Sequence, residues 1–188
     1  MTEATGPPGL PLGRDADAAA VQRVLAGDLE AFEAIVRRWQ GRLVTLAWRF
    51  CRDRSMAEDL AQEAFVKAFK SLATFRAESA FSTWLTAIAL NTYRSALRGR
   101  APMPLLPDPA RAPSPGPDQE AVLHERDRAE MVRQAVLTLP VRYRDAIVMY
   151  CLEERDLAES ARVLGVPSGT LKARLHRARA LLKRRLAG

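Results

Sequence analysis

The sequence predicts an all-α protein of two small helical domains joined by a proline-rich, flexible linker. Apolar residues recur at spacings of three and four along most of the chain, and no alternation of polar and apolar residues is long enough for a sheet. Seven of the twelve prolines lie within 99–119, a density that interrupts any helix. With 188 residues, 48% of them apolar, the chain is long enough for two packed cores. A long internal loop is the alternative interpretation of 99–119.

The first domain is predicted over 15–98, after a disordered tail over 1–14 that is rich in glycine and proline. Asp28 is a suitable N-cap for a helix with one apolar face. The inward positions of that helix are Phe32, Ile35, Val36, Trp39, Leu43, Leu46, Ala47 and Phe50. The next helix has an apolar side made of Ala57, Leu60, Ala61, Ala64, Phe65, Ala68, Phe69 and Leu72, and Asp59, Gln62 and Glu63 share another side. A last helix is predicted over about 80–98. Its inward positions are Phe81, Trp84, Leu85, Ile88 and Ala89.

The second domain is predicted over 120–188 and is also helical. Its first helix, over about 119–138, has as apolar positions Val122, Met131, Val132, Ala135, Val136 and Leu139. Pro140 is suited to open the next helix, whose inward positions are Ala146, Ile147 and Tyr150. Asp156, with Glu159 three residues on, has the form of a helix N-terminus, and Gly165 is suited to a left-handed C-cap.

The positive charge is concentrated at the C-terminal end. Residues 168–188 hold seven lysines and arginines and no carboxylate, and the remaining 22 basic residues balance the 22 acidic ones. The formal net charge of +7 therefore belongs to one element, which is the pattern expected of a phosphate-binding surface. A solvated helix or a helix on a membrane surface is the alternative that charge alone leaves open.

The segment 156–185 combines a short helix, a tight turn at 165–167 and a longer basic helix, which is the helix-turn-helix plan. Apolar residues at spacings of four, three and four share one side of the longer helix, which we expect to face the domain core. They are Leu171, Leu175, Ala178 and Leu182. Side chains near the start of such a helix reach base edges in the major groove, and later arginines hold phosphates. The residues predicted to face DNA are Ser168, Gly169, Thr170, Lys172, Ala173, Arg174, His176, Arg177 and Arg179.

No catalytic, cofactor or metal site is predicted. The chain has two isolated histidines and two cysteines a hundred residues apart, and it has no glycine-rich loop of the kind that binds phosphate. These residues do not make a catalytic site, so we expect a non-catalytic protein without cofactors. Cys51 and Cys151 are expected to be buried, reduced thiols. No apolar stretch is long enough to span a membrane and no secretion signal opens the chain, which predicts a cytoplasmic protein without stable membrane insertion.

The chain resembles the extracytoplasmic-function (ECF) sigma factors of bacteria, the smallest members of the sigma-70 class. The resemblance covers about residues 18–186 and rests on blocks in the right order and separation. These blocks are AGDLEAFEAIVRRWQGRL, AEDLAQEAFVKAF, FRAESAFSTWLTAIALNTYR, LTLPVRYRDAIVMY and GVPSGTLKARLHRARALLKRRL. The resemblance implies that 15–98 corresponds to sigma region 2 and 120–188 to sigma region 4, and that the protein directs core RNA polymerase to promoters.

By the same resemblance, the helix face of Asp59, Gln62 and Glu63 binds the clamp coiled coil of the polymerase. A loop and the helix after it hold the melted minus-10 DNA, through Phe75, Arg76, Ser79, Ala80, Trp84, Asn91 and Arg94. Opening a duplex requires a pocket for an unstacked base, which is the task of that loop. Trp84 also fits the apolar stripe of its helix, so core packing and strand separation are both open for it. Arg94, Arg98 and Arg100 suit non-specific phosphate contacts, or are ordinary surface charges.

Four positions depart from the family pattern and limit what the resemblance implies. Ser160 and Leu157 stand where relatives usually have an aliphatic and an aromatic residue, which predicts looser packing of the short helix. Ser168 stands where an aliphatic residue is frequent in relatives, and His176 occupies a position that varies among them. The resemblance therefore does not tell which minus-35 DNA sequence this protein reads. Two interpretations of His176 remain: its side chain contacts DNA, or it faces solvent.

The resemblance also implies partners. They are core RNA polymerase, through its clamp coiled coil and flap regions, promoter DNA, and a cognate anti-sigma factor that holds the two domains. The balanced charges of the linker predict a flexible tether rather than an electrostatic mimic of RNA. Two other classes compete with this interpretation: a helix-turn-helix regulator that binds an operator unaided, and an enzyme, for which support is weak.

Overall fold

The computed structural model describes residues 14–98, 119–153 and 155–186, and the part of the chain that it describes contains helices and no strand. Four α-helices form the first group: α1 (Arg14–Leu25), α2 (Glu30–Cys51), α3 (Arg54–Ser71) and α4 (Phe81–Leu97), with the short 3₁₀ helix η1 (Leu72–Thr74) after α3. The second group is α5 (Gln119–Leu137), α6 (Val141–Ile147), the π-helical turn η3 (Val148–Leu152), α7 (Leu157–Leu164) and α8 (Ser168–Leu186). The predicted all-α class is therefore confirmed, while most of the predicted linker lies outside the described residues.

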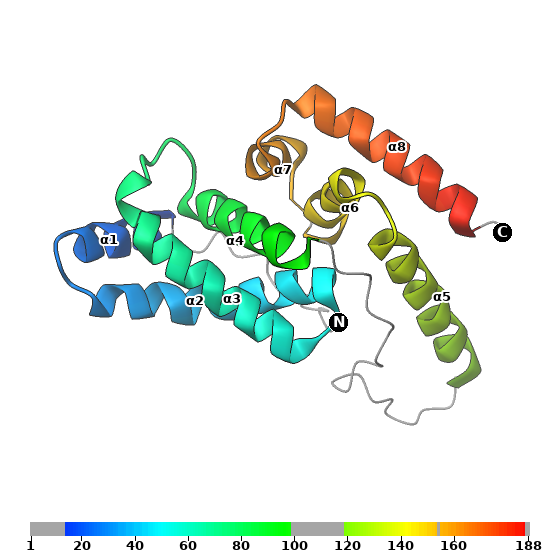
Figure 1. Cartoon of the computed structure of the whole chain (residues 1–188), viewed down its shortest axis with the longest axis horizontal. Coiled ribbons are helices and arrows are strands. Elements are labelled where there is room, and N and C mark those ends of the chain that lie inside the picture. Colours follow the sequence, from blue (N-terminus) through cyan, green and yellow to red (C-terminus); the bar gives the residue numbers. More distant parts are fainter. Residues whose placement is uncertain (1–13, 99–118, 154, 187–188) are drawn as a thin grey trace, which may run out of the picture.

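Helix α2 is the centre of the first group, with α1, α3 and α4 packed around it (Figure 1). Its predicted stripe is buried at Ile35, Trp39, Leu43 and Leu46, among others. Apolar side chains at this spacing leave water together, each contributing about 1.5–3 kcal/mol of burial free energy. The helix is assigned from Glu30, and Asp28 caps it as predicted, because its carboxylate accepts from the amide of Ala31, three residues on, at 3.3 Å.

Buried polar groups tie the first group together. The carboxylate of Asp17 in α1 is 2% exposed and accepts hydrogen bonds from Arg38 and from the indole of Trp39. The hydroxyl of Tyr93 in α4 donates to the Leu43 carbonyl of α2 at 3.0 Å. Because buried polar groups are costly unless paired, these contacts fix how α1 and α4 dock on α2.

The second group packs α6 and α7 against α8, with α5 alongside (Figure 1). Pro140 precedes α6 as predicted, and Ala146 and Ile147 are buried. Ser160, a departure from the family pattern, is fully buried, and its hydroxyl donates to the Met149 carbonyl at 3.2 Å. The serine is therefore accommodated by a hydrogen bond across to η3.

Three expectations from the sequence are wrong. Cys51 is buried, but Cys151 is exposed. Phe69 of α3 and the pair Met131 and Val132 of α5 are exposed too, although their spacing predicts core positions. An apolar periodicity does not distinguish a face that packs on the domain core from a face left open along a groove.

Candidate nucleic-acid and partner interfaces

The helix-turn-helix is formed by local interactions that the sequence encodes. The Asp156 carboxylate caps α7 by accepting from the Glu159 amide at 2.7 Å. Gly165 ends α7 at a φ of 64°, a left-handed conformation that glycine adopts without strain. The chain then turns and starts α8 at Ser168, so both predicted caps of α7 are confirmed.

Helix α8 has one buried side and one cationic side. Leu171, Leu175 and Ala178 are buried against the domain, as the spacing predicts. The DNA-facing positions that the sequence predicts are exposed in the structure, except the half-buried Arg174; the exposed ones are Ser168, Gly169, Thr170, Lys172, Ala173, His176, Arg177 and Arg179. No acidic side chain lies on the helix, so its open surface is suited to a polyanion.

Tyr143 of α6 adds a contact that sequence reasoning missed. Hydrogen bonding to the Arg177 guanidinium, with help from Arg142, lowers the pKa of the Tyr143 phenol below its ordinary value. The guanidinium of Arg142 also lies 4.8 Å from the centre of the tyrosine ring. Arg177 therefore lies near Tyr143 of α6 while it remains on the exposed side of α8.

The loop before α4 rests on an aromatic cluster of Phe75, Phe81 and Trp84, defined here as the loop-base cluster. Ring centres are 5.5 Å apart for Phe75 and Phe81, 5.4 Å for Phe75 and Trp84, and 5.5 Å for Phe81 and Trp84. Trp84 is only half-buried, so it packs in the cluster and keeps part of its ring open. Both interpretations of Trp84 are therefore compatible with its position.

The same loop contains a strained residue. Ala77 has a φ of 57°, in the left-handed region that side chains with a Cβ seldom adopt. Its neighbour Arg76 is exposed, whereas Ser79 and Ala80 are half-buried. An alanine in this conformation costs roughly 1–2 kcal/mol, and such strain is concentrated in loops with a function.

A polar groove runs between α3 and α4. Asn91 lines it together with Lys67 and Lys70, and its side-chain oxygen accepts from Arg94 at 3.2 Å. Sequence reasoning missed both lysines, because periodicity assigns them to the surface of α3 without showing that α4 lies next to them. Arg94 itself pairs with Asp145 of α6, at 2.7 Å between Nε and Oδ2.

The predicted polymerase-binding face of α3 is open. Asp59, Gln62 and Glu63 are all exposed, and Glu63 pairs with Lys67 at 2.6 Å. Gln62 also lines an apolar groove between α2 and α3, together with Leu29, Phe32, Glu33, Val36, Phe65, Val66 and Phe69. The groove explains why Phe69 is exposed: its ring stacks edge-on against Phe32 with centres 5.0 Å apart and forms part of the wall.

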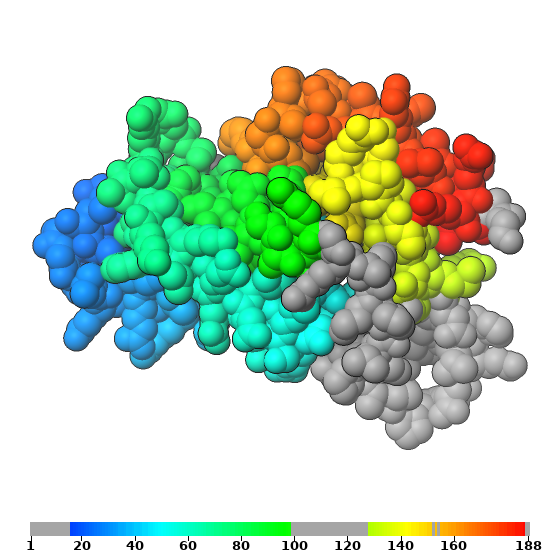
Figure 2. Space-filling view, in the orientation of Figure 1, coloured from blue at the N-terminus to red at the C-terminus, as the bar shows by residue number. Residues whose placement is uncertain are grey.

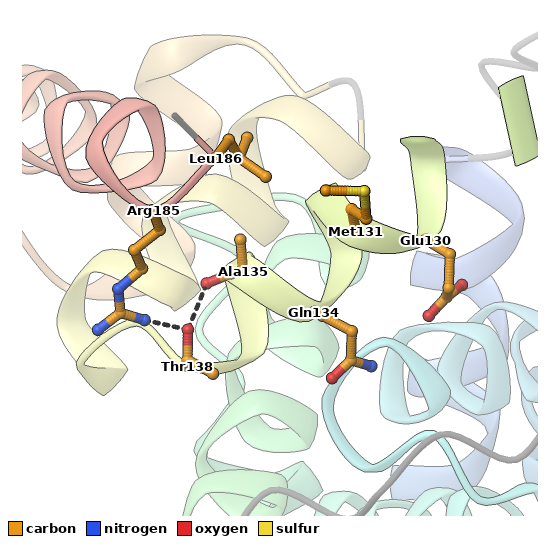
Figure 3. Close-up of a pocket in the computed structure, with 7 residues that line it drawn as sticks. All are labelled: Glu130, Met131, Gln134, Ala135, Thr138, Arg185 and Leu186. Carbon is orange, nitrogen blue, oxygen red and sulfur yellow. Dashed lines mark hydrogen bonds between the residues drawn. The ribbon is translucent and has the colours of Figure 1, made fainter. Parts of the chain in front are cut away.

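A second open groove lies between α5 and the end of α8 (Figure 3). Met131, 59% exposed, lines one side, and Leu186 lines the other. Arg185 joins the two helices by donating to the Thr138 hydroxyl. The exposed Met131 thus belongs to a surface that presents apolar side chains between polar ones.

Among the residues that the structure describes, no cluster of three or more histidine, cysteine, aspartate or glutamate side chains is arranged to hold a metal ion. A membrane-spanning helix is likewise missing from the described segments, because none of their helices is both long and apolar enough.

Comparison with known proteins gives a consistent family. Models of sigma-70 region 2 and sigma-70 region 4 match residues 35–102 and 129–182. The chain is 34% identical to the RNA polymerase sigma-H factor of Pseudomonas aeruginosa, over 93% of this chain and 96% of that protein. It is 33% identical to the ECF RNA polymerase sigma factor SigW of Bacillus subtilis, over 88% of this chain and 94% of that protein.

Solved structures agree. CnrH, in a complex with the cytosolic domain of CnrY, has a TM-score of 0.67 and 27% identity, covering 92% of this chain and 98% of that one. The sigma factor RpoE of Bartonella quintana, in a complex with the anti-sigma factor NepR, shares the fold, with a TM-score of 0.63 at 22% identity over 85% of this chain and 98% of that one. The matches to region 2 and region 4 identify the chain as a transcription protein of the sigma-70 class, and its two helical groups with a helix-turn-helix agree with that class. Within that class, the chain belongs to the ECF family of RNA polymerase sigma factors.

Proposed function

We propose that α8 reads the minus-35 element of a promoter while the loop before α4 and the groove beside it hold the melted minus-10 strand. The observation that carries this proposal is the division of α8 into a buried apolar side and an open cationic side. Lys172 lies near the start of that helix, where side chains reach base edges, and Arg177 and Arg179 follow at phosphate-contacting positions.

The minus-10 part of the proposal rests on the loop-base cluster and the groove between α3 and α4. The aromatic rings support the loop, and we assign Phe75, Arg76, Ser79 and Ala80 to holding an unstacked base. Asn91 supplies an amide for the adjoining base pair. Lys67 and Lys70 extend this surface with charges for the DNA backbone.

The polymerase contacts follow from the two open grooves. The α3 face of Asp59, Gln62 and Glu63 presents two carboxylates and an amide beside an apolar groove. Such a surface suits a basic amphipathic coiled coil such as the clamp. We assign the groove between α5 and α8 to the flap, because Met131 and Leu186 offer apolar side chains to a partner there. In this proposal the protein is a non-catalytic, cytoplasmic subunit of the polymerase, a cognate anti-sigma factor restrains it, and 99–119 tethers a domain at 15–98 to one at 120–188.

Run-off transcription tests the proposal. Purified protein is mixed with core RNA polymerase and genomic DNA fragments, and the start sites of new transcripts are mapped. We expect transcripts that require both the protein and the core enzyme and that share upstream sequence elements. Tight operator binding by the free protein, unimproved by core enzyme and without transcription, would favour the simple helix-turn-helix regulator.

The strained loop gives a sharper prediction. Ala77→Val places a β-branched residue at a φ of 57°, where it is a steric outlier, so the loop should change shape. We expect about a tenfold loss of open complexes, measured by permanganate reactivity of unpaired thymines on the mapped promoter. Ala73→Val is the matched control, because Ala73 is exposed within the ordinary 3₁₀ helix η1. Equal open-complex yields from the two variants would exclude a role for the loop conformation.

A further inference from the structure

Helices α6 and α8 of the second group bring two arginines to one tyrosine. The two helices pack against each other, yellow against orange and red in the space-filling view (Figure 2). Tyr143 of α6 is only 7% exposed, so its ring is held in place by the domain core. Arg177 of α8 reaches its hydroxyl, and this hydrogen bonding lowers the pKa of the phenol. The guanidinium of Arg142 lies 4.8 Å from the ring centre and lowers the same pKa further.

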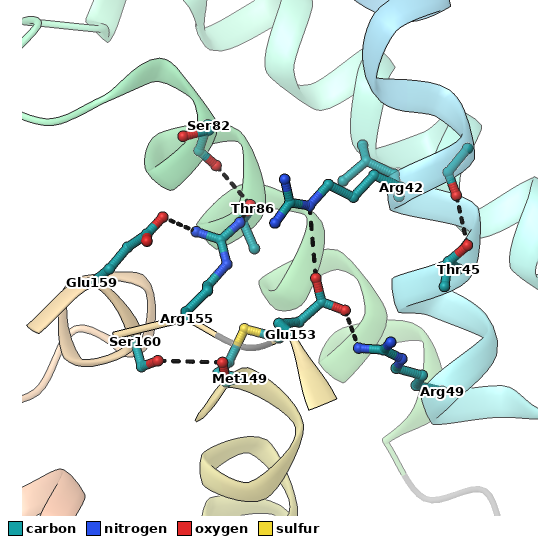
Figure 4. Close-up of polar contacts among 12 residues, drawn as sticks. Arg42, Thr45, Arg49, Ser82, Thr86, Met149, Glu153, Arg155, Glu159 and Ser160 are labelled. Carbon is teal, nitrogen blue, oxygen red and sulfur yellow. Dashed lines mark hydrogen bonds and ion pairs between the residues drawn. The ribbon is translucent and has the colours of Figure 1, made fainter. Parts of the chain in front are cut away.

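Arginines that join elements elsewhere in the chain have carboxylate partners. Where the two helical groups touch, Arg49 of α2 pairs with Glu153, which follows η3, and Arg155 pairs with Glu159 of α7 (Figure 4). Arg155 also donates to the Thr86 hydroxyl of α4 at 2.9 Å. The charges of these arginines are compensated within the protein, so they serve the packing of the fold.

The arginine pair at Tyr143 has no such counter-charge available on its own helices. Helix α8 carries no acidic residue, and the acidic residue of α6, Asp145, is buried and pairs with Arg94. Arg142 and Arg177 are both exposed. Two like charges held near each other repel, and an anion bound between them replaces that repulsion by attraction. The surface around Tyr143 is therefore suited to a small anionic group.

The place of the pair on α8 indicates which anion it takes. Arg177 follows Ala173 by one turn on the exposed side of α8, the side that we assign to minus-35 DNA. Backbone phosphates line the groove that such a helix enters, and a guanidinium can bind a phosphate with two parallel hydrogen bonds. Arg142 belongs to α6, so it adds a cation from outside the helix-turn-helix. The chemistry and the position both favour a phosphate of the DNA backbone.

A hydrogen-bond partner in the free protein makes a guanidinium a better phosphate ligand. An arginine loses rotamer freedom when it binds, and a contact that already restricts it reduces this loss. The hydroxyl of Tyr143 is suited to that task, because the ring that carries it is buried. Phenylalanine keeps the ring and lacks only the hydroxyl, so the contribution of the hydroxyl can be measured separately.

We propose that Arg142 and Arg177 together bind one backbone phosphate beside the minus-35 bases, and that the hydroxyl of Tyr143 positions the two guanidiniums. The proposal rests on the assignment of α8 to minus-35 DNA and adds to it a contact from α6. Phosphate contacts fix where a protein lies on the duplex and carry no sequence information themselves. This contact holds α8 in the register at which Lys172 reaches base edges.

Arg142→Gln tests the contact in the holoenzyme formed from the full chain and core polymerase. The probe is a labelled duplex that carries the mapped minus-35 segment. We expect affinity to fall about fivefold, and the slope of log affinity against log salt concentration to decrease in size by about one. Arg128→Gln is the matched control, because it removes one exposed charge from α5 of the same helical group. The control should change affinity less than about twofold, since its charge is screened from the duplex.

Duplexes in which one phosphate is replaced by an uncharged methylphosphonate locate the contact. One position of this replacement should weaken wild type about fivefold and affect neither Arg142→Gln nor Arg177→Gln, because both have already lost that contact. Arg128→Gln should keep the sensitivity of wild type. Tyr143→Phe should weaken binding about threefold and keep the salt dependence of wild type, since both charges remain. Its thermal melting curve shows whether the ring still packs.

Equal losses in Arg142→Gln and Arg128→Gln, or a methylphosphonate pattern that Arg142→Gln leaves unchanged, would overturn the phosphate contact. Wild-type affinity in Tyr143→Phe would overturn the positioning role of the hydroxyl. Inorganic phosphate at constant ionic strength should not compete with the duplex, and competition that Arg142→Gln abolishes would assign the pair to a free anion instead.

The assignment of α8 is tested separately, by comparing the minus-35 duplex with one of shuffled sequence. If wild-type holoenzyme bound both equally, the minus-35 assignment would be at fault. A methylphosphonate position whose effect disappears in Arg142→Gln would then still support a backbone contact by the arginine pair.

Discussion

Replacing Asp59 and Glu63 together by lysine is expected to weaken binding to core RNA polymerase about a hundredfold, or about 2.7 kcal/mol. Both side chains are exposed on α3, on the face that also carries Gln62 and borders the apolar groove. Lysines there would face a basic partner surface, and like charges across an interface repel instead of steering association. Fold stability should hardly change, because the only ion pair lost among the described residues is the exposed one between Glu63 and Lys67.

The measurement is a titration of labelled protein with core enzyme, followed by run-off transcription at saturating core. The matched control is the double variant Glu30→Lys with Glu78→Lys, which changes the net charge equally at exposed positions outside α3. We expect the control to bind core within threefold of wild type. Equal weakening in both double variants would show that net charge, and not this face of α3, determines docking.

Local signals explain why much of the fold follows from the sequence. The cap at Asp156, the left-handed Gly165 and the buried stripe of α8 depend on residues within one or two turns, and each is confirmed. Buried threonines were harder to foresee, although Thr86 and Thr92 satisfy their hydroxyls on carbonyls one turn earlier, Ser82 and Ile88. A polar residue on a buried helix face leaves no mark in an apolar pattern.

The contacts between the two helical groups could not have been predicted. Arg49 and Glu153 are separated by 104 positions, and nothing local marks either as the partner of the other. The candidate minus-10 and polymerase residues, in turn, came from the family resemblance, and those of α8 came from the helix-turn-helix pattern; the structure adds that most of them are exposed. What the sequence could not indicate is that Arg94 is already engaged by Asp145. From its charge alone, a phosphate contact and an ordinary surface position were both open for Arg94.

Shortening Leu171 to alanine is expected to cost about 3 kcal/mol of stability in the helix-turn-helix domain. Leu171 is fully buried at the first inward position of α8, the helix that packs on α6. Truncation removes apolar burial and leaves a cavity that the short helices around it fill only partly. Because a domain of this size has only several kcal/mol in total, the loss should lower its melting temperature by about 15 °C. As the temperature rises, we expect the variant to lose binding to a minus-35 duplex at a lower temperature than it loses docking on the polymerase through α3.

Leu182→Ala is the matched control, since it removes the same atoms from the same helix at a half-buried position. We expect it to cost about 1 kcal/mol, because a partly exposed side chain loses less burial and opens no closed cavity. Melting followed by circular dichroism gives both values, and a duplex-binding assay gives the temperature at which each variant releases DNA. If Leu182→Ala proved as costly as Leu171→Ala, the docking of α8 would depend on its C-terminal turns. The Gly165 turn would then not fix the angle at which Lys172 meets the groove.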